Sequence, residues 1–169
     1  YMPFPEEMNP FLGWRAIRIS LDEPELFKTQ LRAILRAGVG HKVRIMFPMV
    51  SDLDELRRAR EIVETVKQDL ELNSIEFATD VPVGIMVETP AAAVLVDLLA
   101  EASDFFSLGT NDLTQYTIAV DRGNARVANL FQPLHPAVLR LIRQTIEAGH
   151  SKGKWVGMCG ELAGMRKAI

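Results

Sequence analysis

Cysteine is nearly absent from this chain of 169 residues, in which Cys159 is the only one. A single thiol excludes an internal disulfide and is typical of the reducing cytoplasm, where we expect this protein to be located. Histidine is also scarce, and His41, His135 and His150 are too scattered to form a zinc site with one cysteine. A disulfide scaffold and a zinc-based fold are therefore both excluded.

Long apolar runs and a surplus of positive charge are missing as well. No run approaches the roughly 18 apolar residues that a membrane-spanning helix needs, so we expect no membrane insertion. The net charge is −3, and no basic stripe indicates binding to nucleic acid. With 48% hydrophobic and 24% charged residues, the composition is that of a soluble globular protein.

Short apolar runs recur along the chain and alternate with longer segments of helical periodicity. The runs lack the strict alternation of apolar and polar residues found in a one-sided sheet, which favours strands that are buried on both faces. We therefore expect an α/β fold with parallel strands, and Trp14–Ile19 is a weaker fifth candidate for a strand. The four clearer strands are expected at Val43–Phe47, Val83–Val87, Asp104–Leu108 and Trp155–Cys159.

Several helix boundaries are also visible in the sequence. Two pairs have the spacing of a capping box, and Thr89 stands before a proline at a first helical position. Gly38 and Gly40 are expected to end the first helix, and segment 71–82 is expected to be a connecting loop. No interdomain linker is visible, which indicates one domain or one piece of a domain. The expected helix starts are Asp22 (with Glu25), Ser51 (with Asp54), Thr89 and a position near Pro136.

Polar side chains follow three of the expected strands where those strands end. Glu88 comes directly after the second strand, and Cys159 closes the fourth. Asn111 and Asp112 follow the third strand after a Gly-Thr turn. The carboxyl ends of neighbouring parallel strands meet at one rim of the sheet, where parallel α/β folds place their chemistry. We therefore expect these side chains to lie close together.

These residue types suit a phosphate-bearing substrate. Asp112 can bind a divalent cation, Asn111 and the adjacent backbone can donate to an anion, and Arg122 can clamp a phosphate. Each residue alone has a structural alternative. Glu88 can favour a helix dipole, Cys159 can be a small buried apolar residue, and Arg122 can be a solvated surface charge. Their joint position at matching strand ends favours the functional interpretation.

Four segments resemble a known family. Asp104–Arg122 matches the second signature of the phosphoenolpyruvate-utilising enzymes, and Val87–Pro90 and Met158–Gly164 match two further blocks of that family. Asn9–Arg18 is similar to one branch of it, enzyme I of the bacterial phosphoenolpyruvate-dependent sugar phosphotransferase system. The resemblance implies a (β/α)8 TIM barrel that binds phosphoenolpyruvate and Mg²⁺ at the carboxyl ends of its strands. It also implies that Arg15 adds positive charge near the phosphate, as a weaker candidate.

The resemblance implies a role for each candidate residue. Glu88 and Asp112 would hold the Mg²⁺ ion. Asn111 and Asp112 would contact phosphoenolpyruvate, the latter through its backbone, and Arg122 would grip the phosphoryl group. Cys159 would be the catalytic acid that protonates the enolate carbon and so releases pyruvate.

The activity implied by the resemblance is that of a phosphoenolpyruvate-protein phosphotransferase. Such an enzyme transfers the phosphoryl group to its own histidine and then to a histidine-containing phosphocarrier protein, as the first step of sugar uptake. A closed barrel takes roughly 250 residues, so we expect residues 1–169 to form a partial barrel of four or five strands. None of the three histidines lies in a recognisable acceptor motif. The amino-terminal phosphohistidine and carrier-binding domains are therefore expected to be absent, and the protein is expected to form a homodimer.

Two alternatives stay open at this point. Pyruvate phosphate dikinase and phosphoenolpyruvate synthase share the barrel and similar sequence blocks, although the wording of Asn9–Arg18 and Met158–Gly164 favours enzyme I. The second alternative is that the isolated chain is a binding or assembly fragment without turnover, because it lacks the acceptor histidine.

Overall fold

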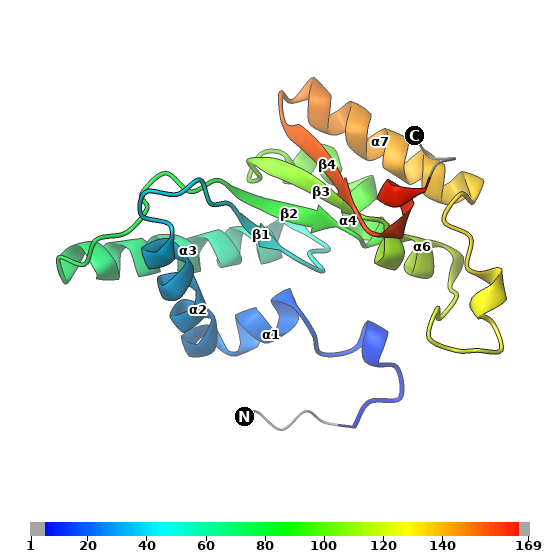
Figure 1. The fold of residues 1–169 in the computed structure, drawn as a ribbon, viewed down its shortest axis with the longest axis horizontal. Coiled ribbons are helices and arrows are strands. Elements are labelled where there is room, and N and C mark those ends of the chain that lie inside the picture. The colour runs from blue at the N-terminus through cyan, green and yellow to red at the C-terminus, as the bar shows by residue number, and fades with distance from the viewer. Residues whose placement is uncertain (1–5, 166–169) are drawn as a thin grey trace.

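A parallel four-stranded sheet forms the centre of the molecule (Figure 1). The computed structural model describes residues 6–165. The strands lie in chain order, and all three pairings are parallel. The four clearer strand predictions are thereby confirmed, with ends that differ by one or two residues at most. The strands are β1 (Ile45–Phe47), β2 (Val83–Val87), β3 (Phe105–Gly109) and β4 (Trp155–Cys159).

The strand register sorts the side chains onto two faces of the sheet. Phe47 pairs with Ile85, which pairs with Phe106, and these three buried side chains share one face. Successive side chains alternate between faces, so Met46 and Trp155 lie on the other face, where they are 36% and 58% exposed. Both faces are therefore rich in apolar side chains, which explains why the strand sequences do not alternate with polar residues.

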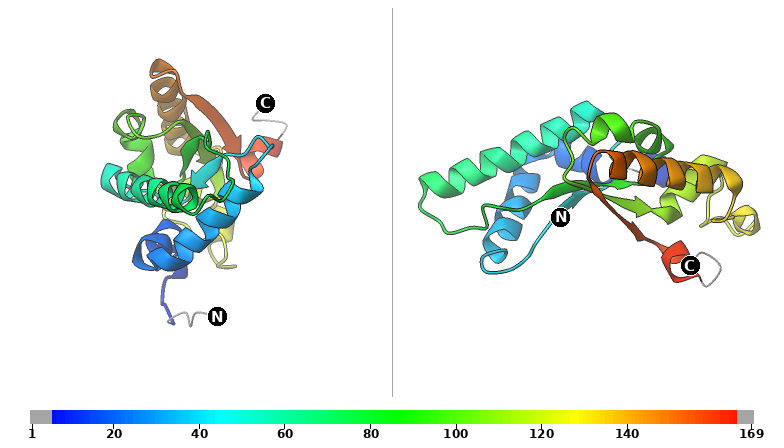
Figure 2. Two further views of the ribbon diagram at one scale, coloured as in Figure 1. Left: turned by 90° about the vertical axis from the view of Figure 1, so that its left-hand side faces the viewer. Right: turned by 90° about the horizontal axis from the view of Figure 1, so that it is seen from above.

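Helices occupy the connections between consecutive strands, as parallel pairing requires. The long helices α3 and α7 run along the sheet (Figure 2), and α7 contacts both β3 and β4. Together with the parallel sheet, these β–α–β units form a partial α/β barrel, which confirms the expected fold class. The helices are α1 (Ile17–Asp22), α2 (Pro24–Ala37), α3 (Leu53–Leu72), α4 (Pro90–Val94), α5 (Val96–Leu99), α6 (Thr110–Ile118) and α7 (Pro136–Ser151), with short 3-10 turns η1 (Pro10–Leu12), η2 (Ala128–Leu130) and η3 (Glu161–Gly164).

The expected fifth strand is wrong. Segment 14–19 leads into helix α1, in which Ile17 is buried and Leu21 packs against the core. Ile17 and Leu21 are four residues apart, so both a helix and a strand would place them on one face. A strand would also need a neighbouring strand for its backbone hydrogen bonds. The segment contacts α2 and α3 instead.

Two of the helix starts differ from the predictions. The capping box of α3 is formed by Asp52 and Glu55, one residue later than expected, and Ser51 donates its hydroxyl hydrogen to Glu55 instead. No side-chain cap starts α2, whose N-cap residue is Glu23 and whose first residue is proline. Thr89 is confirmed as the cap of α4, since its hydroxyl accepts a hydrogen bond from the Ala92 N–H.

Other boundaries agree with the sequence. Helix α2 ends before Gly38, and α7 begins at Pro136. The loop after α3 starts at residue 73, slightly later than expected, because α3 runs to Leu72. Among the helices of residues 6–165, none has both the length and the apolar character that crossing a membrane would require.

Candidate functional site

The carboxyl ends of β2, β3 and β4 carry the residues that the sequence singled out. Glu88 directly follows β2, and α6 begins at Thr110 immediately after β3. A Cβ atom on Gly109 would lie 2.7 Å from the Cβ of Glu88, so the absence of a side chain at this position lets β3 end against Glu88. This close approach allows α6 to bring Asp112 to the same place.

Asp112 lies in the first turn of α6 and is bracketed by two arginines. One carboxylate oxygen, Oδ2, is 3.2 Å from Arg15 Nη2, and the other, Oδ1, is 2.5 Å from Arg122 Nη1. The carboxylate is nearly buried, with 5% of the residue exposed, whereas the two arginine side chains are about one third exposed, at 34% and 31%. A buried carboxylate therefore has two partly accessible cationic groups beside it.

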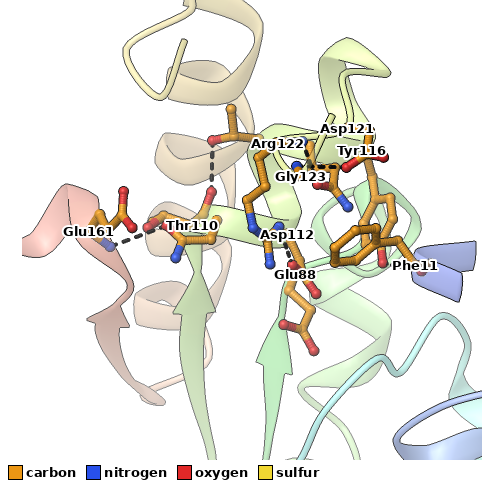
Figure 3. Close-up of polar contacts among 12 residues, drawn as sticks. Phe11, Glu88, Thr110, Asp112, Tyr116, Asp121, Arg122, Gly123 and Glu161 are labelled. Carbon is orange, nitrogen blue, oxygen red and sulfur yellow. Dashed lines mark hydrogen bonds and ion pairs between the residues drawn. The ribbon is translucent and has the colours of Figure 1, made fainter. Parts of the chain in front are cut away.

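Glu88 lies next to this cluster (Figure 3) and has an unusual protonation equilibrium. Its Oε1 accepts a hydrogen bond of 2.7 Å from the Met49 N–H, and only 6% of the residue is exposed. Burial raises the pKa of Glu88 from 4.5 to about 7. The Met49 hydrogen bond lowers this pKa and the charge of Asp112 raises it, while Arg15 and Arg122 make smaller lowering contributions. The nearby positive charges therefore do not offset the loss of hydration that the Glu88 carboxylate suffers on burial.

Arg122 is held at its backbone and at its guanidinium group. Its N–H donates to Gln115 Oε1 at 3.1 Å, and its Cζ lies 5.2 Å from the centre of the Phe11 ring. Nη1 is close to Asp112, but the contact lacks hydrogen-bond geometry, and this buried nitrogen has no hydrogen-bond partner within residues 6–165. About a third of the Arg122 side chain is exposed, so the rest of the guanidinium group can reach an anionic ligand.

Three further residues complete the charged cluster, and the sequence pointed to only one of them. Arg15 was a weaker candidate, and its Nη1 donates to the Tyr116 hydroxyl at 3.1 Å. Tyr116 in turn donates to the Phe11 carbonyl oxygen. Tyr116 was missed, although its position one helical turn after Asp112 is a signal that it shares the helix face of that carboxylate. Phe11 was missed because only the tertiary structure brings η1 beside α6.

Asn111 and Cys159 lie on the β3–β4 side of the rim. Asn111 Oδ1 accepts a hydrogen bond of 3.2 Å from the Glu161 N–H, which leaves its NH₂ group as the side-chain donor. The half-buried Cys159 has its Sγ 3.4 Å from the Leu108 carbonyl oxygen and 3.6 Å from Ser107 Oγ. No hydrogen bond or ion pair within the described part of the chain joins these two residues to the Glu88–Asp112 cluster. The structure thus brings Asp112 and Arg122 into contact, with Glu88 near enough for their charges to influence its pKa and with Asn111 and Cys159 at adjacent strand ends.

The donor set suits a hard divalent cation that shares its coordination with a substrate. Residues 6–165 contain no group of three or more histidine, cysteine, aspartate or glutamate side chains arranged to hold a metal. Mg²⁺ is usually bound by one or two carboxylates and completes its shell with water and substrate oxygens. Glu88 and Asp112 supply two buried carboxylates, and the raised pKa of Glu88 marks a place where added positive charge is favourable.

Known proteins with similar sequences match the chain over its whole length. Residues 1–169 match the family model described as "PEP-utilising enzyme, PEP-binding domain", in which PEP is phosphoenolpyruvate. A phosphoenolpyruvate-protein phosphotransferase of Haemophilus influenzae is 55% identical over 168 residues, which are 99% of this chain and 29% of that protein. The phosphoenolpyruvate-protein phosphotransferase of Staphylococcus carnosus is 56% identical over 169 residues, which are 30% of its length. The chain therefore spans less than a third of these relatives.

Solved structures support the fold. A citrate lyase from Burkholderia xenovorans superposes with a TM-score of 0.60 at 25% sequence identity, over 78% of this chain and 40% of that one. An HpcH/HpaI aldolase/citrate lyase family protein from Burkholderia cenocepacia superposes with a TM-score of 0.59 at 20% identity, over 85% of this chain and 58% of that one. These likenesses agree with a partial α/β barrel. The full-length family match and the relatives of more than half identity confirm the resemblance to enzyme I, and the chain belongs to the phosphoenolpyruvate-utilising enzymes.

Proposed function

We propose that this chain is the phosphoenolpyruvate-binding part of a Mg²⁺-dependent phosphoenolpyruvate-protein phosphotransferase of a sugar phosphotransferase system. The observation that carries the proposal is the buried Asp112 carboxylate beside Glu88, with Arg15 and Arg122 on either side of it. Phosphoryl transfer needs positioning and neutralisation of charge on the moving group, and arginines with a divalent cation supply both. The names of the two relatives favour this function over the dikinase and synthase alternatives.

Different residues bind the metal, the phosphoryl group and the rest of the substrate. Glu88 and Asp112 would hold Mg²⁺, which when bound neutralises and orients oxygens of the substrate. Arg122, with Arg15, binds the phosphoryl oxygens, because guanidinium groups match phosphate geometry. Asn111 donates its NH₂ group to the substrate, and the adjacent backbone N–H assists.

Cys159 completes the reaction at the substrate carbon. When the bond between phosphorus and the bridging oxygen breaks, the phosphoryl group passes to a histidine nitrogen and the enolate of pyruvate is left. The Cys159 thiol then gives its proton to the terminal enolate carbon, which forms pyruvate, and solvent returns a proton to the thiolate. This protonation favours transfer, because the enol form of pyruvate is much less stable than the keto form.

The acceptor is proposed to lie outside residues 1–169. We place the phosphohistidine and carrier-binding domains in the remaining length of the full protein, with a histidine-containing phosphocarrier protein as the partner. His135 of this chain has a structural role, since its Nδ1 accepts a hydrogen bond from the Ala137 N–H at the start of α7. The proposal includes a cytoplasmic homodimer as the working form, and an isolated chain that binds substrate without turning it over.

Binding by this chain tests the proposal directly. Phosphoenolpyruvate is titrated with the chain and followed by ³¹P NMR, with Mg²⁺ and then with excess chelator. We expect Mg²⁺-dependent broadening that Asp112→Asn abolishes and that the control Asp54→Asn retains, because the Asp54 side chain is 89% exposed on α3. Binding that persists unchanged in Asp112→Asn, or that ignores Mg²⁺, would contradict the proposed site.

A further inference from the structure

We propose that Tyr116, together with the Phe11 ring, is a positioning residue that holds the Arg15 and Arg122 guanidinium groups in place for the substrate phosphate. The inference rests on the proposed function, because the anion it concerns is the one that function requires. It adds to that function a pair of neutral side chains whose task is to orient the two cationic ones.

Arg15 is held by two side chains of helix α6. Its Nη1 donates to the Tyr116 hydroxyl at 3.1 Å, while its Nη2 lies 3.2 Å from Asp112 Oδ2. Tyr116 and Asp112 are four residues apart on α6 and so share one face of that helix. Two groups from one rigid element thus contact two nitrogens of the same planar guanidinium group, which sets its orientation as well as its position.

The Tyr116 phenol also anchors the segment whose Phe11 ring lies beside both arginines. The Tyr116 hydroxyl donates to the Phe11 carbonyl oxygen, which fastens η1 to α6. The centre of the Phe11 ring lies 5.7 Å from Arg15 Cζ and 5.2 Å from Arg122 Cζ. Both distances are within the range of cation–π attraction. Figure 3 shows the Phe11 and Tyr116 rings beside the Asp112–Arg122 contact.

Neutral side chains orient an arginine without reducing its charge. An arginine held only by a carboxylate has its charge partly neutralised, which weakens its attraction for phosphate. Arg15 and Arg122 already share the single charge of Asp112, and the neutral Tyr116 and Phe11 orient them without neutralising them further. Burial, and secondly the nearby Asp112 carboxylate, raise the pKa of Tyr116, so the phenol keeps its proton at neutral pH and can donate it to Phe11.

A double-mutant cycle in this chain tests the role of the Tyr116 hydroxyl. The dissociation constant for phosphoenolpyruvate is measured by ³¹P NMR in excess Mg²⁺ for the wild type, Tyr116→Phe, Arg15→Met and the double variant. We expect Tyr116→Phe to weaken binding about tenfold, as for loss of one hydrogen bond to a charged group. In the Arg15→Met background the same change should weaken it clearly less, because the direct Tyr116–Arg15 hydrogen bond is gone and only the support of Arg122 through Phe11 is left to lose.

Two controls separate positioning from a general effect on the fold. Thr117→Val removes a buried hydroxyl from the next position of α6, one that has no hydrogen-bond partner within the described residues, and it should leave the affinity unchanged. The affinity of Tyr116→Phe for Mg²⁺ alone should also equal that of the wild type, because Tyr116 makes no hydrogen bond to Glu88 or Asp112.

Each other outcome overturns the inference in a recognisable way. Equal losses in the two backgrounds mean that Tyr116 acts through the fold, and unchanged affinity in Tyr116→Phe means that it does not act at all. If Tyr116→Phe does not fold, Phe11→Leu takes its place, and wild-type affinity in that variant overturns the inference. A wild-type chain that binds no phosphoenolpyruvate overturns the proposed function and this inference with it.

Discussion

At the scale of single residues, Glu88 links the site to stability through its protonation. Burial raises its pKa from 4.5 to about 7, so between these pH values the folded chain binds a proton that the unfolded chain has released. Without a divalent cation, this group therefore favours the folded state most below pH 4.5, and its contribution is lost as the pH rises toward 7. The full shift corresponds to about 3 kcal/mol.

Urea unfolding in chelator between pH 5 and pH 8 measures this contribution. We expect the free energy of unfolding of the wild type to fall with pH relative to that of Glu88→Gln, whose side chain does not titrate. Parallel curves for the two proteins would show that Glu88 is ionised in the fold at every pH tested.

The same carboxyl group predicts how Mg²⁺ binding depends on pH. Because proton and cation compete for Glu88, the apparent affinity for Mg²⁺ should fall as the pH drops below about 7, approaching tenfold per pH unit. Isothermal titration calorimetry from pH 5.5 to 8 gives the profile. Glu88→Gln should bind Mg²⁺ weakly at every pH, and a flat wild-type profile would place the cation elsewhere.

Cys159 is expected to act in chemistry and not in binding. In the full-length protein, Cys159→Ala should reduce pyruvate release by about 100-fold or more, as for loss of a catalytic acid, while Mg²⁺-dependent phosphoenolpyruvate binding is retained. Met158→Ala is the matched control, because Met158 is the preceding residue of β4 and lies on the opposite face of the sheet. Near-normal turnover in Cys159→Ala would rule out the proposed acid.

At the scale of secondary structure elements, the junction after β4 depends on a glycine. Gly160 has φ +93°, and a Cβ atom there would lie 2.5 Å from Thr110 Oγ1, whose hydroxyl donates to the Cys159 carbonyl oxygen at 3.0 Å. Gly160→Ala would therefore impose backbone strain and press the β4 end away from the start of α6. It would move Cys159 and Asn111 relative to each other.

We expect Gly160→Ala to destabilise the fold by about 2–4 kcal/mol, from a conformation that is costly with a side chain plus the close contact. Gly153→Ala is the comparison, because Gly153 also has a positive φ, +68°, but a Cβ atom there meets nothing within 4 Å. It should cost only about 1 kcal/mol. Thermal and urea unfolding of both variants check the difference, and equal losses would mean that the Thr110 contact carries no cost.

At the scale of the whole molecule, one face of the sheet and both of its edges are open to association. Met46 and Trp155 are exposed on that face, and β1 and β4 are edge strands. Open edges and exposed apolar patches favour pairing with another chain. We therefore expect the isolated 169-residue chain to be oligomeric at micromolar concentrations, through its edges or through exchange of elements between copies.

Light scattering of the purified chain measures this association. Trp155→Lys should shift the population toward monomer, because it places a charge on the open face beside an edge strand. Leu72→Lys serves as the control, since Leu72 is 86% exposed at the end of α3, away from the sheet. A wild-type chain that is monomeric and unfolds cooperatively would show that the sheet is adequately covered within one copy.

Local sequence patterns predicted most of the strands and one helix cap, and particular residues show why. The four strands were predictable because apolar runs buried on two faces are local features, and Thr89 was predictable because its hydroxyl caps the helix that follows directly. Ser51 was placed one position too early, since neighbouring polar residues compete for the same cap. The strand expected at Trp14–Ile19 was wrong, because its apolar residues pack on helices and not on a neighbouring strand.

The sequence by itself determined the family and the alternating order of β and α elements. It also determined the candidate residues, because these follow from local patterns and from the residues of known motifs. The candidates are Glu88, Asn111, Asp112, Arg122 and Cys159. Only the tertiary structure decided that Arg15 and Arg122 lie on either side of Asp112, that Arg15 donates to the Tyr116 hydroxyl and that the Phe11 ring lies near both arginines. The raised pKa of Glu88 was also decided there. Contacts between residues about a hundred positions apart, like burial and the pKa values that burial sets, exist only once the elements have packed.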